Sequence, residues 1–547
     1  MEKHHYSWII VLIALVAASY CIGINAYIQE VDPATYAEVS REMVESHDYI
    51  YLHDNYRAYL DKPPATMWLI AACYKILGIT NYAVRIPSFV MAIAALCSVF
   101  WLGTMLWNKQ AGLLSALILA SSAASKLMIQ DPKIDMVLIG FMTLSFAFLY
   151  RGLSDSRFLW PGYMAMAFAF LTKGPISIGI PALAFGAYAF WKKDRSVIKR
   201  LKPVRGLLLA AALILPWYIA VALKRGDYTA YFMLFKQSFG RFYAQQFNYG
   251  GDDLFYIHTF AWAFLPWTLF FVTLLVQRFV NWRKKTRPDD GEVFTLWWWI
   301  LPFVILSLAI SKLPQYIFWV MPPAALLTGR WLDEKLDKGL SKHENIIFSV
   351  QYVFVFLPPV LLAVLFILSF PPKTILPWLG LGAGLFVIIM VSITGIQKVK
   401  KIIILSAMSM ILFDVLFGGY LYPAVLKYQP FQIFGKQIRE LAGGKKSVIL
   451  SYQYGERGTL NYYSRMPVRE VDTAQEVDQY LKTQNPSYFI TTNSQIEKLK
   501  KMGYDINLID TLPFYPTSRM DRSFLLKQDR NTSLTALSIG TISRQKR

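Results

Sequence analysis

Apolar runs of about 20 residues recur along the chain from the N-terminus to about Tyr422. A helix of that length spans the roughly 30 Å hydrocarbon core of a lipid bilayer. Of the 547 residues, 55% are hydrophobic and only 17% are charged, which is too apolar for a soluble chain of this length. The sequence therefore predicts a polytopic α-helical membrane protein.

The runs predict about thirteen membrane-spanning helices. Some runs are short, and two are separated only by "TKGP", so this count has a margin of one or two. The first run is expected to be a retained anchor, because no small-residue cleavage site follows it. The predicted spans are residues 7–27, 84–106, 111–128, 134–150, 158–173, 175–191, 206–223, 256–277, 294–311, 315–329, 346–369, 374–396 and 402–422.

The formal net charge of +21 raises the question of a nucleic-acid partner. The basic clusters "WKKDRSVIKRLKPVR", "RFVNWRKKTR", "RWLDEKLDKGLSK" and "QKVKK" all fall on one side of the predicted spans. This is the positive-inside pattern, so the charge orients the protein in the membrane and does not indicate nucleic-acid binding.

Two large pieces are predicted on the other, external side. One is the loop 28–82, which carries interfacial helices within a membrane domain 1–422. The other is residues 423–547, where the strand-like runs "VILSY" and "SYFITT" alternate with the polar helical stretches "TAQEVDQYLKTQ" and "SQIEKLKKMG". They predict a small α/β domain without a catalytic constellation, with a structural or acceptor-docking role. The three cysteines lie in or beside apolar segments and indicate neither disulfides nor a metal site.

The first external loop begins with a predicted amphipathic helix in "EVDPATYAEVSREMVESHDY". Tyr36 belongs to its apolar face, and Glu38 and Arg41 belong to its charged face, so we expect the helix to lie at the outer membrane interface. Asp32 stands just before it, where a carboxylate can cap the helix or take part in chemistry. Further along, "LDKPP" places Asp61 and Lys62 directly before a helix, where Lys62 either binds a ligand or extends to the headgroup region as an interfacial lysine.

A second external carboxylate, Asp131, stands in "LMIQDPKIDMVL", and Asp135 follows one helical turn later at a depth where ionisable groups are costly. Helix capping is the alternative for Asp131 as well. Lysines and arginines recur at outer membrane boundaries despite the positive-inside bias, and these are Lys62, Lys173, Arg241 and Lys312. Cations at headgroup level favour an anionic lipid ligand, with phosphate as the obvious group.

An ordered series of motifs makes a resemblance specific. "VDPATYAEVSREMVESHDYI", "LDKPPATMWL", "QDPKIDM", "FLTKGP", "LPWYIA", "FGRF", "LPWTLFF" and "SKLPQYI" resemble, in this order, the motifs of the lipid A aminoarabinose transferases and the wider protein O-mannosyltransferase-like superfamily. These are GT-C glycosyltransferases. The resemblance is clearest over residues 1 to about 330, and the C-terminal domain matches only in position and size.

The resemblance implies roles for individual residues. Asp32 matches the first member of the family's Asp-Glu motif, with Pro33 in place of the second, and Asp131 matches the second acidic position. Tyr36 is a supporting residue of the site. Lys62, in an Asp-Lys-Pro version of the Glu-Lys-Pro motif, implies a polyprenyl-phosphate ligand, with Asp61 beside it. The family's other donor-phosphate residues correspond to Arg241, Lys312 and Tyr316.

We therefore expect a transferase that moves a sugar from a polyprenyl-phosphate-linked donor to an acceptor on the outer face of a bacterial inner membrane. The sequence does not distinguish lipid A, another glycolipid and a protein hydroxyl as the acceptor, and it does not identify the sugar. Attack opposite the leaving group implies inversion, and the cations imply a metal-independent reaction without a cofactor. The alternative is a transporter or flippase for an anionic or lipid-linked substrate, whose charges would line a route through the bilayer.

Overall fold

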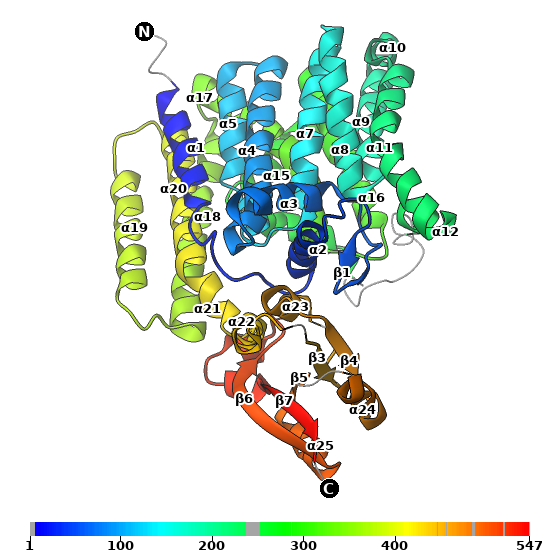
Figure 1. Ribbon diagram of the computed structural model, residues 1–547. Helices are drawn as coiled ribbons and strands as arrows, with labels where there is room; N and C mark the ends of the chain where they lie inside the picture. Colours follow the sequence, from blue (N-terminus) through cyan, green and yellow to red (C-terminus); the bar gives the residue numbers. More distant parts are fainter. Residues whose placement is uncertain are drawn as a thin grey trace.

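The computed structural model describes residues 6–236, 252–285, 287–445, 447–455, 457–483, 487–517 and 520–545. It has a helical membrane domain and, below it in Figure 1, a smaller domain built on a β-sheet. The fold class predicted from the sequence is confirmed.

Each of the thirteen predicted spans contains helix. The first ten correspond to α1 (Ser7–Ser19), α4 (Asn81–Leu106), α5 (Lys109–Ala120) with α6 (Ala123–Gln130), α7 (Ile134–Gly152), α8 (Leu159–Lys173), α9 (Ile176–Lys192), α11 (Pro203–Arg225), α14 (Phe255–Ala263) with α15 (Thr268–Arg283), α16 (Asp290–Leu308), and η4 (Pro314–Val320) with α17 (Met321–Lys338). The last three are α18 (Lys342–Val364) with η5 (Leu365–Ser369), α19 (Leu376–Ser392), and α20 (Lys398–Leu416) with η6 (Phe417–Leu421). Short helices α10 (Ser196–Leu201) and α12 (Asp227–Tyr231) flank α11.

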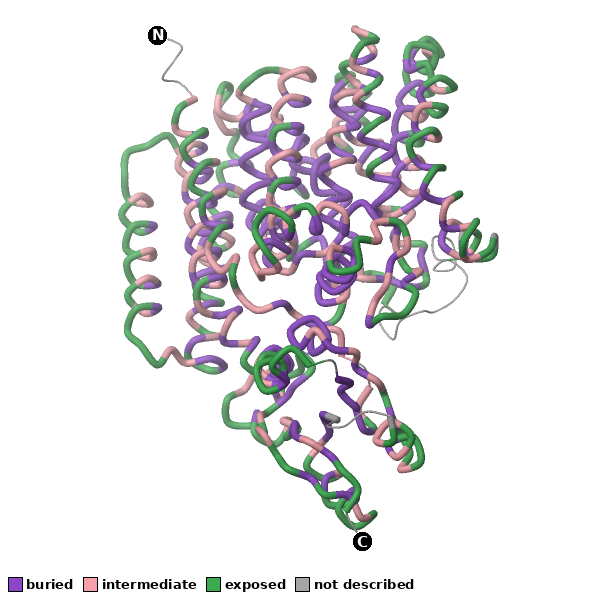
Figure 2. Tube along the Cα trace, viewed as in Figure 1, coloured by how far each residue is buried: buried purple, intermediate pink, exposed green. Residues whose placement is uncertain are grey.

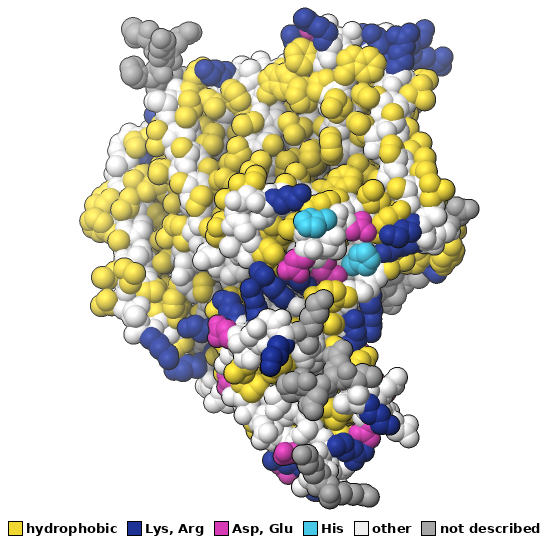
Figure 3. All heavy atoms as spheres, in the orientation of Figure 1, with side chains coloured by type: hydrophobic (Ala, Val, Ile, Leu, Met, Phe, Trp, Pro, Cys, Tyr) yellow, Lys and Arg dark blue, Asp and Glu magenta, His cyan; other side chains and the backbone are white. Residues whose placement is uncertain are grey.

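By length and hydropathy alone, six helices among the described residues can cross a membrane, or seven if the bent pair α5–α6 is one span. The other predicted spans are shorter or interrupted helices or, in α17, a helix with too many charged residues. The predicted number of thirteen crossings therefore stays a prediction. Figure 3 shows an apolar band across the helices, with clusters of Lys and Arg at the end away from the sheet domain and further Lys and Arg, mixed with acidic side chains and histidines, where the band meets the sheet domain.

Hydrogen bonds join two interrupted spans at their breaks. Helices α5 and α6 meet at a bend of 55°, and α14 and α15 are separated around Leu265. The backbone N–H of Ala123 donates to the carbonyl oxygen of Leu265 at 3.0 Å, and Trp267 Nε1 donates to Ser121 Oγ at 3.1 Å. Backbone groups released by one break are thus satisfied at the other, which lets non-helical backbone exist at membrane depth.

The loop 28–82, predicted to be external, folds onto the end of the membrane domain that faces the sheet domain (Figure 1). It contains α2 (Asp32–Ser46), the two-residue strands β1 (His53–Asp54) and β2 (Arg57–Ala58), and α3 (Ala65–Leu77), which begins directly after the two prolines of "LDKPP". Buried side chains of α2, such as Tyr36 and Met43, join those of α3, such as Ile70 and Tyr74, in one apolar cluster. Figure 2 shows α2 as a largely buried helix between the two domains.

The C-terminal domain is a mixed sheet covered on both faces. Its strand order is β4-β3-β5-β7-β6, in which β3 is parallel to β4 and β5, and β7 is antiparallel to β5 and β6. Successive residues of β3 face opposite sides: Ile449 packs with α22 and α23, and Leu450 packs with α24 and α25. The elements are α21 (Tyr422–Leu426), α22 (Phe431–Ala442), β3 (Ile449–Tyr452), α23 (Gly458–Ser464), β4 (Val468–Val471), α24 (Ala474–Thr483), β5 (Ser487–Thr492), α25 (Asn493–Lys501), β6 (Tyr504–Phe514), α26 (Arg522–Leu525), α27 (Arg530–Ser533) and β7 (Thr535–Arg544).

Both predicted strands and both predicted helices of this domain are present, as β3, β5, α24 and α25. The predicted boundary at residues 422 and 423 stays a prediction.

Candidate active site

Asp32 is the first residue of α2, and not the residue before the helix as the sequence suggested. The N-cap position is Val31, no side-chain cap is formed at this end, and Pro33 occupies the first turn, where its missing N–H costs nothing. The Asp32 carboxyl is half-buried, and its burial raises its pKa above the ordinary value of 3.8. A cap does not explain this carboxylate in the observed structure.

Four charged side chains lie close enough to Asp32 to act on its ionisation. Lys133 and Lys62 lower the pKa of Asp32, while Asp131 and Asp135 raise it. They come from three parts of the sequence that the fold brings together: the start of α2, the segment before α3, and the link between α6 and α7. This grouping, at the end of the membrane domain that faces the sheet domain, is the centre of the candidate site.

Asp131 was expected at the start of a helix, but it is the residue that directly follows α6, at its C-cap position. Its Oδ2 atom is 3.1 Å from Lys133 Nζ, while its Oδ1 atom is buried without a hydrogen-bond partner. Burial alone would lower the pKa of Lys133, but the carboxylates of Asp131 and Asp32 outweigh it and raise that pKa. Lys133 is thus held as a cation between two carboxylates.

Lys62 is half-buried and Asp61 is exposed. Lys62 Nζ donates to the backbone carbonyl oxygen of Asp61 at 3.1 Å. The two prolines that follow are buried, so the backbone that carries Lys62 is fixed against the outer end of the membrane domain.

A second group surrounds Lys173, at the outer end of α8. Lys173 forms an ion pair with the buried carboxylate of Asp135, which also accepts a hydrogen bond from Trp319 Nε1 at 3.2 Å. Lys173 Nζ lies 4.1 Å from the centre of the Tyr316 ring, which is stacked on Trp319 at 5.3 Å. Because Asp135 also acts on Asp32, it connects the two groups.

Lys312 and Tyr316 are both buried, at 5% exposure each. Lys312 Nζ donates to the backbone carbonyl oxygen of Asp252 at 3.0 Å. Tyr36, also predicted for the site, is buried on α2 one turn after Asp32. Arg241 lies outside the described residues, so its assignment stays a prediction.

Arg85 was not identified from the sequence. It is fully buried near the outer end of α4 and donates to the backbone carbonyl oxygens of Ala26 at 2.7 Å, Gln130 at 2.8 Å and Tyr27 at 2.9 Å. One guanidinium therefore ties the segment leading to Asp32 to the residue before Asp131. An arginine inside an apolar run is costly unless it is paired, and that signal was available in "NYAVRIPSF".

Lys133 is the other residue that sequence reasoning missed, although it stands within a motif that was singled out. Within the described parts of the chain, no group of three or more His, Cys, Asp or Glu side chains is arranged to hold a metal ion.

Comparisons with known proteins show relatives in sequence and in fold. Residues 61–219 match the family model of dolichyl-phosphate-mannose-protein mannosyltransferases. An undecaprenyl phosphate-alpha-4-amino-4-deoxy-L-arabinose arabinosyl transferase of Proteus mirabilis is 29% identical over 330 residues, 59% of this chain and 59% of that protein. A transferase of the same name from Pectobacterium atrosepticum is 29% identical over 331 residues, 59% of this chain and 58% of that protein. The match thus spans less than two thirds of these relatives.

The fold extends further than the sequence match. The crystal structure of ArnT from Cupriavidus metallidurans bound to undecaprenyl phosphate superposes with a TM-score of 0.77 at 18% identity, covering 98% of both chains. The archaeal oligosaccharyltransferase AglB from Archaeoglobus fulgidus, in complex with an inhibitory peptide and a dolichol-phosphate, gives a TM-score of 0.52 over 92% of this chain and 73% of that one, at 11% identity. The chain is therefore a multi-span membrane protein with the GT-C fold of these solved structures, and its sequence is similar to those of aminoarabinose transferases.

Proposed function

We propose that the protein is a membrane glycosyltransferase that moves a sugar from a polyprenyl-phosphate-linked donor to an acceptor on the outer face of the bacterial inner membrane. The observation that carries the proposal is the group of Asp32, Asp131, Lys133 and Lys62 at the external end of the membrane domain. In support, the two relatives are undecaprenyl phosphate-alpha-4-amino-4-deoxy-L-arabinose arabinosyl transferases, and the Cupriavidus structure is bound to undecaprenyl phosphate.

The charges of the site suggest a division of roles. Two of its three carboxylates have lysines of their own, because Asp131 is paired with Lys133 and Asp135 is paired with Lys173. Asp32 is influenced by Lys133 and Lys62 together. We assign Asp131 and Asp135 to holding the lysines, and Asp32 to the reaction.

In the reaction, the bond between the anomeric carbon and the phosphate oxygen breaks, and polyprenyl phosphate leaves. Lys62, Lys312 and Tyr316, with Arg241, would stabilise the negative charge that grows on the departing phosphate, in a site where water is largely excluded. The acceptor attacks the opposite side of the anomeric carbon, which inverts its configuration. A hydroxyl acceptor loses its proton to Asp32, and the raised pKa of Asp32 brings this carboxylate closer to the range in which a general base is effective.

The arrangement argues against the transporter alternative. A route for a charged substrate needs polar groups at successive depths of the membrane. The candidate groups instead gather at the external end, between the first loop, the link after α6 and the outer end of α8. An outer-face site also explains a lipid-linked donor, because nucleotide sugars stay in the cytoplasm.

The proposal is tested in cells that lack the gene and carry either the wild-type protein or Asp32→Asn. We expect wild-type cells to show one glycosyl mass increment on lipid A, on another glycolipid or on an exported protein, and Asp32→Asn cells to lack it. In parallel, the purified wild-type protein should release polyprenyl phosphate from a radiolabelled polyprenyl-phosphate sugar when membrane extract supplies the acceptor. No glycosyl difference in any of the three fractions, together with no release of polyprenyl phosphate, would refute the proposed function.

A further inference from the structure

The charged face of α2 is buried, although its pattern predicts a face exposed at the membrane interface. Glu38 and Arg41 are fully buried and Glu42 is 5% exposed. Arg41 forms ion pairs with Glu38 and Glu45 on its own helix, and its Nε atom donates to Glu38 Oε2 at 2.8 Å. Charged side chains are rarely buried to this degree unless another part of the protein covers and pairs them.

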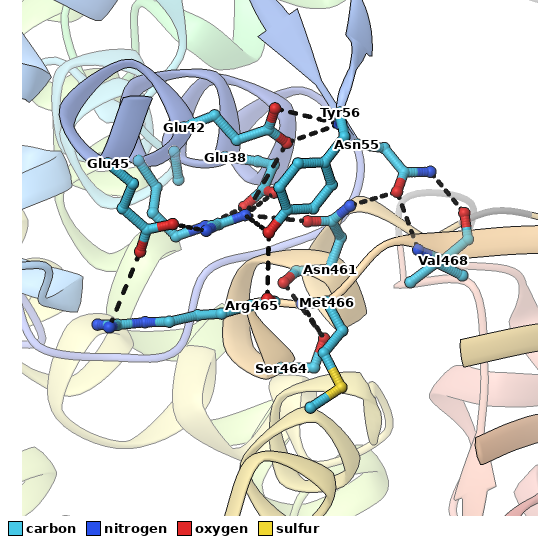
Figure 4. Close-up of polar contacts among 12 residues, drawn as sticks. Glu38, Glu42, Glu45, Asn55, Tyr56, Asn461, Ser464, Arg465, Met466 and Val468 are labelled. Carbon is cyan, nitrogen blue, oxygen red and sulfur yellow. Dashed lines mark hydrogen bonds and ion pairs between the residues drawn. The ribbon is translucent and has the colours of Figure 1, made fainter. Parts of the chain in front are cut away.

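The cover comes from the C-terminal domain (Figure 4). Asn461, on α23, is 1% exposed, and its Oδ1 atom lies 3.4 Å from Arg41 Nη2. Its amide nitrogen donates to Asn55 Oδ1 at 2.5 Å. Asn461 therefore joins the guanidinium of α2 to the turn between β1 and β2.

That turn is itself attached to the edge of the C-terminal sheet. Asn55 Nδ2 donates to the carbonyl oxygen of Val468 at 2.7 Å, and the backbone N–H of Val468 donates to Asn55 Oδ1 at 2.9 Å. The side-chain amide thus makes the pair of hydrogen bonds that a neighbouring strand would make. Tyr56 Oη donates to the carbonyl oxygen of Arg465 at 3.1 Å, and Arg465 lies 3.8 Å from Glu45 (Figure 4).

The same short helix also holds the chain on the other side of Asp32. The backbone N–H of Thr459 donates to Glu30 Oε1 at 3.1 Å, and the backbone N–H of Ile28 donates to Tyr463 Oη at 3.1 Å. Tyr463 Oη donates in turn to Asn81 Oδ1, at the start of α4, at 2.7 Å. Helix α23 therefore forms hydrogen bonds with residues of the loop 28–82 both before and after Asp32.

We propose that α23 is a positioning element of the active site, which fixes the register and tilt of α2 and with them Asp32, and that Asn461 is its principal positioning residue. The proposal rests on the proposed function, and it gives the C-terminal domain a role in the transfer step. The apolar side of α2 packs on α3, but apolar packing alone permits sliding, whereas the amide and guanidinium bonds are directional.

The test compares Asn461→Leu, which keeps the volume and removes both polar contacts, with Asn531→Ala, an exposed asparagine of the same domain. The conservative Asn461→Asp keeps the oxygen that faces Arg41, so its kcat should fall less than that of Asn461→Leu. Full-length proteins in nanodiscs are compared by hydrogen exchange of α2, by Kd for undecaprenyl phosphate, and by kcat for release of polyprenyl phosphate. We expect Asn461→Leu to speed amide exchange in α2 but not in α7, to leave Kd within about twofold, and to lower kcat at least about tenfold.

Two outcomes overturn the inference. One is unchanged amide exchange of α2 in Asn461→Leu, which would show that α23 does not fix α2. The other is faster exchange with wild-type kcat, which would show that the position of α2 does not set the rate of transfer. Should Asn461→Leu fail to fold, Asn55→Ala, which loosens the same junction from the other side, is measured in its place. Absence of transfer by the wild-type protein is a different result, since it refutes the proposed function and is recognised before any variant is compared.

Discussion

Replacement of Asp32 by asparagine separates a reacting carboxylate from a structural one. The amide has almost the same shape and keeps an acceptor oxygen, so the packing of α2 on α3 should be unchanged. It removes only the charge and the ability to take a proton. Asparagine caps helices about as well as aspartate does, so any purely capping role would survive.

The structure gives the expected size and sign of two effects. Burial raises the pKa of Asp32, so its ionised form is less favourable in the folded protein than in the unfolded chain. Its ionisation therefore costs stability as pH rises above 3.8, and Asp32→Asn should leave the unfolding temperature at pH 7 unchanged or slightly higher. Transfer should fall by at least about a hundredfold, about 2.7 kcal/mol in activation free energy, the lower range for loss of a general base.

The assay measures the initial rate of polyprenyl phosphate release at saturating donor, together with donor affinity and thermal unfolding of each protein. Asp521→Asn is the matched control, because Asp521 is an actual helix cap that accepts from the backbone N–H of Phe524 at 2.9 Å. The wild-type rate should also fall as pH drops through a raised pKa, and Asp32→Asn should lose this dependence. A well-folded Asp32→Asn protein that transfers sugar at near the wild-type rate would show that the mechanism is wrong.

Three further predictions concern the lipid site, the topology and the junction of the domains. Lys62→Ala should weaken undecaprenyl phosphate binding by about 1 to 3 kcal/mol, roughly 5- to 150-fold, whereas Lys75→Ala should not, and equal affinities would return Lys62 to an interfacial role. Reporter fusions near residues 200 and 285 should be cytoplasmic and those near 55 and 480 external, and a cytoplasmic signal at 55 would place the site in the wrong compartment. Burial and the adjacent Glu38 raise the pKa of Glu42 from 4.5 to about 9, against the opposite effect of Arg41, so the folded protein keeps a proton that the unfolded chain releases. Stability should therefore fall as pH rises from 4.5 to about 9. Between pH 6 and 9 the unfolding temperature of Glu42→Gln should fall less than that of the wild-type protein, and identical falls would contradict the raised pKa of Glu42.

The membrane fold was predictable because it depends on local composition. Apolar runs of about 20 residues predict membrane helices. Each of the predicted spans contains a helix. The interruptions were harder, because the bend between α5 and α6 depends on a contact between Ala123 and Leu265, which are far apart in the sequence. The strands β3 and β5 were predictable from their β-branched and aromatic residues.

The candidate site was only partly predictable. Asp32, Lys62 and Asp131 stand in motifs, and the fold brings them together. Lys133 also acts on Asp32, and Arg85 binds the carbonyl oxygens of Ala26 and Gln130, so these long-range partners appear only when the chain is folded. The orientation of α2 was misjudged for the same reason, since the helix pattern cannot show that Asn461 will cover Arg41.

That contact joins residues 420 positions apart. At a synthesis rate of about 5 to 20 residues per second, α2 is made roughly 20 to 80 s before the helix that covers it. Until α23 is made, Arg41 lacks its contact with Asn461, and charged side chains are more stable in water than against an apolar surface. A charged face therefore serves the growing chain as protection against premature packing, and becomes an interior face only when the last part of the protein has arrived.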